Sequence, residues 1–197
     1  PQELEAIHAV AAMLGRRARV ALRVNPDVDA QTHPYISTGL RQSKFGVPIQ
    51  EALELYRSMR ALPYLDPVGV HAHIGSQITQ VSPFQESVAK LVPLVHALRQ
   101  DGFDIQYLDI GGGIGIRYRD EGPPAPIDYA NTLRPLLSAL ACTELMEPGR
   151  FLVGNAGSLL TRVLYEKANQ DKKFLVVDGG MNDLIRPALY QARHRIE

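Results

Sequence analysis

Leu108-Asp109-Ile110-Gly111-Gly112-Gly113 joins an apolar strand to three consecutive glycines, and this stretch decides how the 197-residue sequence is interpreted. Glycines let a backbone approach a ligand closely and point several N–H groups at an anion. The triplet does not fit the dinucleotide-binding fingerprint, because the third glycine of that fingerprint would fall at Ile116. Two interpretations stay open: a phosphate cradle of another kind, or a tight turn.

The sequence on either side of the triplet alternates between helix and strand. Apolar residues at helical spacing predict helices over about residues 4–14, 52–59, 82–102 and 128–140, with Ser82 and Asp128 as N-terminal caps. Strands are predicted over 18–24, 68–74, 105–110 and 145–146. The strand ends recur about one βα unit apart, which predicts an α/β fold built as a partial (β/α)8 barrel of the TIM type.

The pattern changes after Arg150. Two strands, over 159–165 and 174–177, are joined by a polar turn at 169–172, which predicts the start of a β-rich C-terminal domain. We therefore place a partial barrel at 1–152 and the second domain at 153–197. A complete barrel has eight strands and about 250 residues, so four predicted strands imply an internal fragment or dependence on a partner segment.

Composition narrows the class of protein. The sequence has 21 basic and 21 acidic residues and no basic stripe, so a nucleic-acid partner is not expected. It has no apolar run as long as a membrane span, so membrane insertion is not expected either. The single cysteine, Cys142, excludes an internal disulfide and fits a reducing compartment, so a cytoplasmic location is expected.

Two histidines are predicted on the same side of a strand in His71-Ala72-His73-Ile74-Gly75-Ser76-Gln77. Metal binding is one interpretation, but no Asp, Glu or Cys stands at ligand spacing nearby, so no metal site is predicted. His71 is interpreted as a packed histidine. His73, at the end of the strand, is placed to lie flat against a planar cofactor ring, and Ser76 to donate to a phosphate or a ring hydroxyl.

A carboxylate and a guanidinium lie three residues apart in Glu147-Pro148-Gly149-Arg150, at the end of another predicted strand. Glu147 is either a rim carboxylate paired with Arg150 or the partner of a pyridine nitrogen, which it keeps protonated. The pair suits a ligand with a basic ring nitrogen at one end and a phosphate at the other, such as pyridoxal phosphate. This motif, like the glycines, follows a parallel strand, where barrels gather their chemistry.

Three further residues can be interpreted either as functional or as surface residues without a role in a site. Lys44 is a candidate Schiff-base lysine on sequence alone, but we favour a solvated or ion-paired lysine. Arg186 and Tyr190 are spaced i, i+4, so both can face one anionic group of a substrate. The alternative for this pair is a surface position on either side of Pro187.

Taken together, these motifs resemble the alanine-racemase-fold decarboxylases, the fold type III enzymes that depend on pyridoxal phosphate. The segments around Tyr35 and Arg186 point to the members that act on meso-diaminopimelate rather than on ornithine or arginine. The ordered set spans nearly the whole chain and is specific to the family. The matching segments are Arg23-Val24-Asn25-Pro26, His33-Pro34-Tyr35-Ile36-Ser37-Thr38-Gly39, Ser43-Lys44-Phe45-Gly46, His73-Ile74-Gly75-Ser76-Gln77, Leu108 to Gly113, Glu147 to Arg150, Asp178-Gly179-Gly180-Met181-Asn182-Asp183 and Arg186-Pro187-Ala188-Leu189-Tyr190.

The resemblance implies that pyridoxal 5'-phosphate is the cofactor and that the carboxylate at the D-centre of meso-diaminopimelate is removed to give L-lysine. It implies that His73 stacks on the cofactor ring and that Glu147 pairs with the pyridine nitrogen. The full cofactor-binding set that it implies is His73, Ser76, Gly111, Gly112, Gly113, Glu147, Pro148, Gly149 and Arg150. The implied substrate-binding set is Arg150, Arg186 and Tyr190.

The resemblance also implies that two catalytic residues of the family lie outside this sequence. The family's Schiff-base lysine lies upstream of Pro1 and its proton-donor cysteine downstream of Glu197, and Cys142 does not match that motif. We therefore expect no catalytic residue in this chain and no decarboxylation by it alone. Family members are homodimers with sites at the subunit interface, so a homodimer that binds an amino-acid substrate is expected. A related basic amino-acid decarboxylase and a non-catalytic homologue that binds the cofactor are the alternatives.

Overall fold

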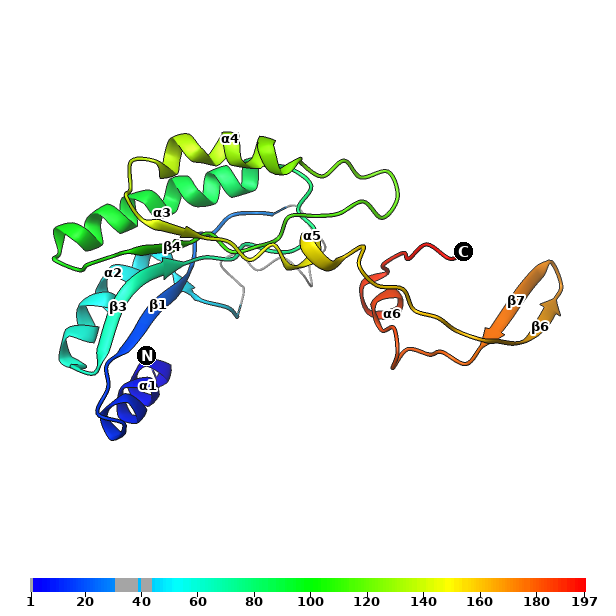
Figure 1. The fold of residues 1–197 in the computed structure, drawn as a ribbon, viewed down its shortest axis with the longest axis horizontal. Coiled ribbons are helices and arrows are strands. Elements are labelled where there is room, and N and C mark those ends of the chain that lie inside the picture. The colour runs from blue at the N-terminus through cyan, green and yellow to red at the C-terminus, as the bar shows by residue number, and fades with distance from the viewer. Residues whose placement is uncertain (1, 31–38, 40–43) are drawn as a thin grey trace.

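The computed structural model describes residues 2–30, 39 and 44–197. A parallel sheet with helices is followed by a separate antiparallel hairpin (Figure 1). The elements in chain order are α1 (Gln2–Met13), β1 (Ala18–Asn25), β2 (Val47–Pro48), α2 (Ile49–Ser58), the 3-10 helix η1 (Met59–Ala61), β3 (Leu65–His71), α3 (Ser82–Gln100), β4 (Tyr107–Asp109), α4 (Pro126–Leu137), β5 (Thr143–Leu145), α5 (Gly149–Val153), β6 (Val163–Asn169), β7 (Lys172–Val177) and α6 (Arg186–Tyr190).

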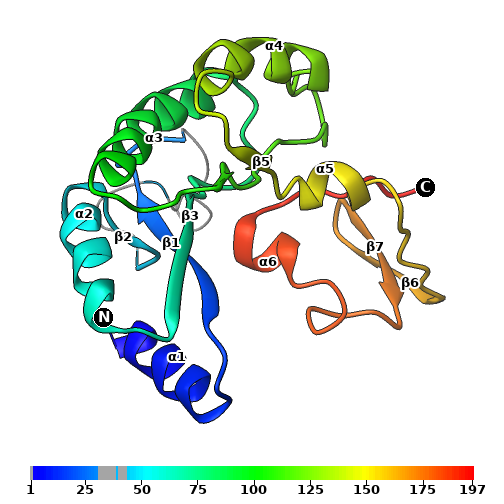
Figure 2. The ribbon, with the colours of Figure 1, turned by 60° about the vertical axis from the view of Figure 1, so that its left-hand side comes forward.

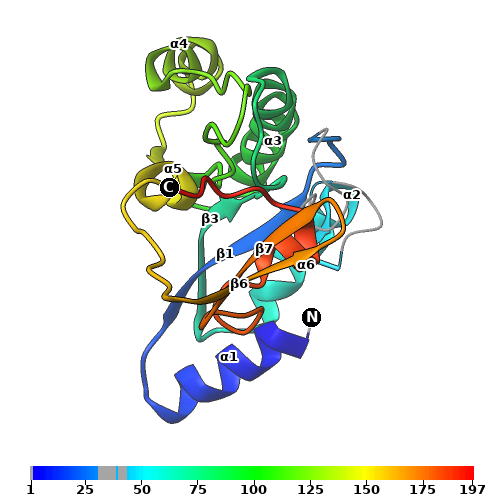
Figure 3. The same cartoon turned by 90° about the vertical axis from the view of Figure 1, so that its right-hand side faces the viewer.

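The main sheet has five strands in the order β2-β1-β3-β4-β5, and all its neighbours pair in parallel. Helices α1 to α4 follow one another along one side of the sheet, from α1 at the bottom to α4 at the top (Figures 1 and 3). Helices α5 and α6 lie on the concave side (Figure 2). This is the predicted partial β/α barrel, in which one face of the sheet is covered by helices.

The core lies between the sheet and the helices that follow its strands. In α3 the buried residues Val88, Leu91, Val95 and Leu98 recur at helical spacing, and none is more than 1% exposed. They meet alternate residues of the strands, such as Val70 and Leu108, which are fully buried. Because this apolar stripe of α3 covers one face of the sheet, the opposite face is the one that remains open for polar residues.

The predicted strands are present, with shifted ends. Strand β3 spans Leu65–His71 rather than 68–74, so His73 lies just beyond the strand. The two-residue strand β2 was not predicted, because two residues are too short to produce an alternating pattern. The predicted hairpin forms between β6 and β7, and its turn falls at Gln170 and Asp171.

Both predicted side-chain caps are wrong. Helix α3 is preceded by Val81 and α4 by Ala125, and neither helix start has a side-chain cap hydrogen bond. Each helix has a proline in its first turn, Pro83 or Pro126. Proline has no N–H that needs an acceptor and already holds a helical φ, so these helices begin without a capping side chain.

The buried hydroxyl of Tyr56 closes an irregularity between β1 and β3. The strand register shifts at this point, since Val20 pairs with Pro67 while Ala21 pairs with Gly69. The hydroxyl donates to the carbonyl of Gly69 over 2.5 Å and accepts from the N–H of Leu22 over 3.3 Å. Tyr56 is fully buried in α2, and this burial raises the pKa of its hydroxyl. One side chain thus satisfies two backbone groups where the strand ladder is interrupted.

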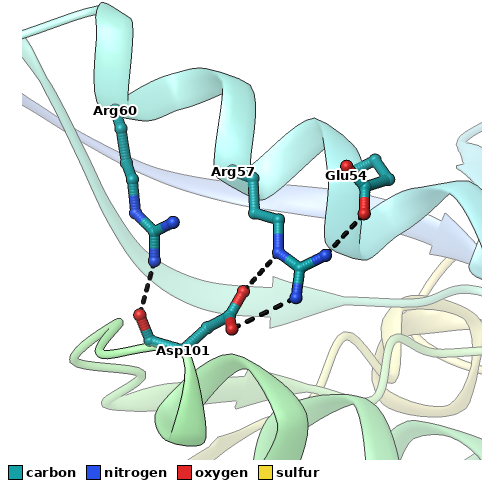
Figure 4. A network of polar contacts seen from close by, with 4 residues as sticks. All are labelled: Glu54, Arg57, Arg60 and Asp101. Carbon is teal, nitrogen blue, oxygen red and sulfur yellow. Dashed lines mark hydrogen bonds and ion pairs between the residues drawn. The ribbon is translucent and has the colours of Figure 1, made fainter.

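A polar network joins α2 to the end of α3 (Figure 4). Arg57 contacts both carboxylate oxygens of Asp101, with Nε–Oδ2 at 2.5 Å and Nη2–Oδ1 at 3.2 Å, and it also contacts Glu54. Arg60 donates to the backbone carbonyl of Asp101. The fork of Arg57 fixes the spacing of two neighbouring helices on the outside of the sheet.

The hairpin of β6 and β7 extends away from the main sheet (Figure 1). Most of its residues are exposed, including the apolar side chains of Val163, Leu164, Tyr165, Phe174 and Leu175. No helix within the described part of the chain is both long enough and apolar enough to cross a membrane.

Candidate functional site

The open face of the sheet carries a row of polar residues at the carboxyl ends of its strands. Register pairs Arg23 of β1 with His71 of β3, His71 with Asp109 of β4, and Asp109 with Leu145 of β5. Residues paired in register share a face, because successive side chains in a strand alternate between faces. Glu147 lies two residues after the end of β5 and is half exposed, with 49% of its side chain accessible. The row therefore forms the floor of a site at one rim.

His73 and Glu147 meet at this rim together with the second glycine of the triplet. The backbone N–H of Gly112 donates to Nδ1 of His73 over 3.2 Å, and the same Nδ1 lies 3.5 Å from Oε2 of Glu147. Burial and then the charge of Arg23 lower the pKa of His73, against the opposing effect of Glu147. The ring is therefore held neutral, with Nδ1 as an acceptor and the proton on Nε2.

The three glycines permit backbone to lie directly against backbone. A Cβ on Gly112 would stand 1.9 Å from the carbonyl oxygen of Glu147. Gly111 and Gly113 have φ of +73° and +111°, and a Cβ there would meet the carbonyl oxygens of Ala72 at 2.4 Å and Gly75 at 2.3 Å. The triplet is thus required by the close approach of the loops after β3, β4 and β5, whatever ligand it binds.

Two of the three glycine N–H groups already have acceptors inside the protein. The N–H of Gly111 donates to Oδ1 of Asp109 over 2.8 Å, and that of Gly112 donates to His73. Of the three, the N–H of Gly113 is the one with no acceptor among the described residues. An anion at this rim would therefore be held by Gly113 together with side-chain donors, rather than by three glycine N–H groups.

His71, Asp109 and Glu147 form a cluster that sequence spacing did not reveal. One ligand atom from each lies within 4.8 Å of the others, and Nε2 of His71 is 3.7 Å from Oε2 of Glu147. No acid stands close to His71 in the sequence, because Asp109 belongs to β4 and Glu147 follows β5. Nε2 of His71 is shielded from solvent and makes no hydrogen bond within the described part of the chain.

Arg23 is a second residue that sequence reasoning did not assign to the site. Its Nη2 donates to the carbonyl of His73 over 3.4 Å, and its guanidinium lies 4.9 Å from the centroid of the Phe45 ring. Burial lowers the pKa of Arg23, and the charge of Glu147 acts in the opposite direction. Arg23 therefore supplies positive charge beside both His73 and Glu147.

Arg150 joins the loop after β3 to the rim. Its Nη2 and Nε donate to the hydroxyl of Ser76 over 2.9 and 3.3 Å. Its Nη1 donates to the hydroxyl of Tyr118 over 2.8 Å. The structure thus brings Ser76 and Arg150 together, and adds Tyr118, which the sequence did not identify.

Arg186 reaches the same tyrosine from α6. Its Nη1 lies 3.1 Å from the Tyr118 hydroxyl and 3.2 Å from Nε2 of His194. Tyr190 is half-buried and ends the same short helix. No carboxylate among the described residues lies within 4.0 Å of the guanidinium of either Arg150 or Arg186. Two positive charges without an acidic partner therefore converge on one phenol.

The remaining candidates lie away from this cluster or outside the described residues. Lys44 is exposed, and its Nζ lies 5.2 Å from the centroid of the Phe45 ring. The segment around Tyr35, one of the segments that match the family, lies outside the described residues apart from Gly39. Pro148 and Gly149 connect Glu147 to Arg150 at the start of α5.

The assembled rim can bind a flat, partly cationic ring and more than one anionic group. Glu147 offers a half-exposed carboxylate beside the neutral ring of His73, while Ser76, Gly113 and the two arginines offer donors. A carboxylate stabilises a protonated ring nitrogen, and guanidiniums favour carboxylates and phosphates. The predicted convergence of the glycines, His73, Glu147 and Arg150 on one rim is confirmed, whereas their individual roles stay predictions.

Comparisons with known proteins agree with this chemistry. The pyridoxal binding domain of the pyridoxal-dependent decarboxylases matches residues 1–154. Diaminopimelate decarboxylase of Aquifex aeolicus is 53% identical over 196 residues, which are 99% of this chain and 47% of that protein. The enzyme of the same name from Pseudomonas aeruginosa is 54% identical over 191 residues, or 97% of this chain and 46% of that protein.

A solved structure agrees equally well. Diaminopimelate decarboxylase from Helicobacter pylori, complexed with L-lysine, superposes with a TM-score of 0.93 at 45% sequence identity, covering 98% of this chain and 49% of that one. This chain spans about half the length of the curated relatives that it matches. The match to a pyridoxal-dependent family confirms the cofactor predicted from the sequence.

Proposed function

Because the chain belongs to the pyridoxal-dependent decarboxylase family, we propose that it forms part of a carboxy-lyase that acts on meso-2,6-diaminopimelate. The reaction removes the carboxylate at the D-centre as carbon dioxide and leaves L-lysine. The proposal takes its substrate from the relatives, which carry the name diaminopimelate decarboxylase, and from the L-lysine bound in a similar structure.

One observation carries the choice of substrate. The guanidiniums of Arg150 and Arg186 lie 2.8 and 3.1 Å from one phenol oxygen, and no carboxylate of the described residues neutralises them. A diamino acid with a second carboxylate supplies the missing negative charge. Ornithine and lysine have only the carboxylate that is lost, so they would leave Arg186 without an anion. Uncompensated charge of this kind disfavours binding.

The residues at the rim fit pyridoxal phosphate. Glu147 is accessible to a ring nitrogen, His73 presents a neutral imidazole beside it, and the Gly112 backbone lies so close to Glu147 that no side chain can intrude. When bound, the protonated cofactor ring draws electrons from the carbon that loses carbon dioxide. Glu147 keeps the ring nitrogen protonated, and burial keeps His73 from adding a competing positive charge.

We assign the phosphate to the donors of Gly113, Ser76 and Arg150, and the second carboxylate of the substrate to Arg186 and Tyr190 together with Arg150. The N–H of Gly149 already donates to the carbonyl of Glu147 over 2.7 Å, so Gly149 contributes to this rim as backbone rather than as a donor. Ser76 already accepts from Arg150 through its oxygen, so its hydroxyl hydrogen remains able to donate to an anion. Arg150 therefore serves both groups through different nitrogens. In this assignment Glu147 of the His71 cluster pairs with the cofactor rather than with a metal ion.

The full-length enzyme is proposed to act as a homodimer in the cytoplasm. The homodimer follows from the family resemblance, and the location from the single free cysteine. Sedimentation equilibrium of the full-length protein tests the first proposal, and a mass near that of one subunit would contradict it. Fractionation of cells that express the protein tests the second.

The direct test incubates the full-length protein with pyridoxal phosphate and meso-diaminopimelate. Carbon dioxide and L-lysine should appear in equal amounts, as measured by chiral chromatography and gas release. The matched control is Glu147→Gln, which keeps the shape of the side chain and removes the charge that protonates the ring. Cofactor binding without any carbon dioxide from the wild-type protein would favour the non-catalytic homologue and overturn the proposal.

A further inference from the structure

Within the described part of the chain, Tyr118 is the one side chain that hydrogen-bonds to both Arg150 and Arg186. Its hydroxyl accepts from Nη1 of Arg150 over 2.8 Å and from Nη1 of Arg186 over 3.1 Å. The two guanidinium carbons lie 5.9 and 5.2 Å from the centroid of its ring. Arg150 belongs to the helix that follows the parallel sheet, and Arg186 to α6, so the phenol connects two separate segments of the chain.

The position of Tyr118 is fixed by contacts other than those with the arginines. A carboxylate oxygen of Glu121 accepts from the backbone N–H groups of Tyr118 and Arg119 over 2.9 and 2.6 Å, which closes the loop. The ring of His194 lies edge-on to the Tyr118 ring, with centroids 5.9 Å apart and planes at 88°. These contacts fix the position of the Tyr118 ring independently of the arginines. The hydroxyl can therefore determine where the two longer arginine side chains lie.

The chemistry of the contact explains why a phenol suits this position. Two guanidiniums repel one another, and a shared acceptor between them lets both approach the same point, because each donates a hydrogen bond to it. A phenol oxygen accepts both bonds without adding a negative charge, so it does not compete with an incoming carboxylate. An acid at the same position would neutralise the pair in advance.

We propose that Tyr118 is a positioning residue that holds Arg150 and Arg186 together to bind the second carboxylate of the substrate. This inference rests on the proposed function and names a residue outside the substrate-binding set derived from the sequence. Without the hydroxyl, the two guanidiniums separate and the carboxylate loses contacts, while Nε and Nη2 of Arg150 keep their hydrogen bonds to Ser76 on the phosphate side. The defect should therefore appear in the binding of carboxylate-bearing ligands.

The test uses the full-length enzyme carrying Tyr118→Phe, which keeps the ring and removes only the hydroxyl. The control is Tyr165→Phe, the same change on the exposed hairpin strand β6. The Tyr118 variant should raise KM for meso-diaminopimelate about tenfold, as expected for hydrogen bonds to charged groups, and should change kcat less than about threefold. The control variant should change neither constant.

A second readout does not depend on turnover. Calorimetric titration of L-lysine and of cadaverine compares two ligands that differ by one carboxylate. Tyr118→Phe should weaken the binding of L-lysine about tenfold and leave the binding of cadaverine unchanged, whereas a general loss of structure would weaken the binding of both ligands. In an Arg186→Gln background, Tyr118→Phe should have a much smaller effect on L-lysine, because the arginine it positions is absent.

The outcomes separate this inference from the proposed function. A wild-type enzyme that makes L-lysine, with a Tyr118→Phe variant that matches it in KM and in L-lysine affinity, would overturn the positioning role alone. Equal and additive effects in the two backgrounds would also overturn it. A wild-type protein that neither decarboxylates meso-diaminopimelate nor binds L-lysine would overturn both.

Discussion

The backbone N–H of Gly112 donates to Nδ1 of His73, with 3.2 Å between the two nitrogens. This bond sets the tautomer, because an Nδ1 that accepts a hydrogen bond leaves the ring proton on Nε2. It also joins the loop after β4 to the loop after β3 at the point where Glu147 approaches. One backbone donor therefore fixes the orientation of the ring that faces the proposed cofactor.

Gly112→Ala should damage this arrangement, because the new Cβ would stand 1.9 Å from the carbonyl oxygen of Glu147. The backbone must move, and overpacking of this kind costs roughly 1–3 kcal/mol of stability. The affinity for pyridoxal phosphate should also fall, which an absorbance titration measures. Gly157→Ala is the matched control, since nothing lies within 4 Å of its Cβ. Equal behaviour of the two variants would refute the steric argument.

His73 should make the stability of the chain depend on pH. Burial lowers its pKa in the folded state. Between that value and the ordinary value of about 6.5, the unfolded chain binds more protons, so stability falls as the pH drops through this window. Above about 6.5 the contribution is fully present. Urea unfolding across the window should show a shallower slope for His73→Gln than for the wild type.

The control for this titration is His96→Gln, because His96 is exposed on α3. The His96→Gln variant should show the same dependence of the unfolding free energy on pH as the wild type. If His73→Gln and His96→Gln gave the same pH profile as the wild type, His73 would not be held neutral by the fold.

The sequence predicted those parts of the fold that depend on local pattern. The strand that runs into Gly111, and the buried face of α3, follow from spacing and glycine punctuation alone. The side-chain caps at Ser82 and Asp128 were predicted wrongly, because the neighbouring prolines already favour helix initiation. Local rules compete with one another, and the sequence does not reveal which rule prevails.

The contacts of the site were harder to predict. Tyr118 meets residues 32 and 68 positions away, and no periodic pattern encodes such a contact. Asp109 was within the most informative segment, yet its place beside His71 depends on strand order and register. In the structure Arg23, His71 and Asp109 each stand at or near the carboxyl end of a parallel strand. The predicted strand over 68–74 placed His71 in its middle, so the row of three did not emerge from the sequence.

Tyr56→Phe should destabilise the fold without touching the site. Its hydroxyl serves the carbonyl of Gly69 and the N–H of Leu22 at the register shift between β1 and β3. Loss of one partner leaves buried backbone groups unsatisfied, at a cost of about 1–3 kcal/mol. Chemical denaturation measures the change, and Tyr165→Phe is the exposed control. A change below about 0.5 kcal/mol would show that the hydroxyl is not needed there.

Arg57→Gln should reduce the sensitivity of the fold to acid. The hydrogen bonds from Arg57 lower the pKa of Asp101. A lowered folded-state pKa contributes stability that is present above the unfolded value of about 3.9 and is lost as pH falls through the folded value. The melting temperature of the wild type should therefore fall more than that of the variant below about pH 4. High salt should shrink the difference, because both groups are partly exposed.

The most direct test of the account compares meso-diaminopimelate with D-lysine as substrates of the full-length enzyme. D-lysine keeps the reacting centre and lacks only the carboxylate that we assign to Arg150, Arg186 and Tyr190. If the two guanidiniums hold that carboxylate, kcat/KM for D-lysine should be lower by at least about a hundredfold, since two charge-assisted hydrogen bonds are lost. Decarboxylation of D-lysine at a rate close to that of meso-diaminopimelate would contradict the account.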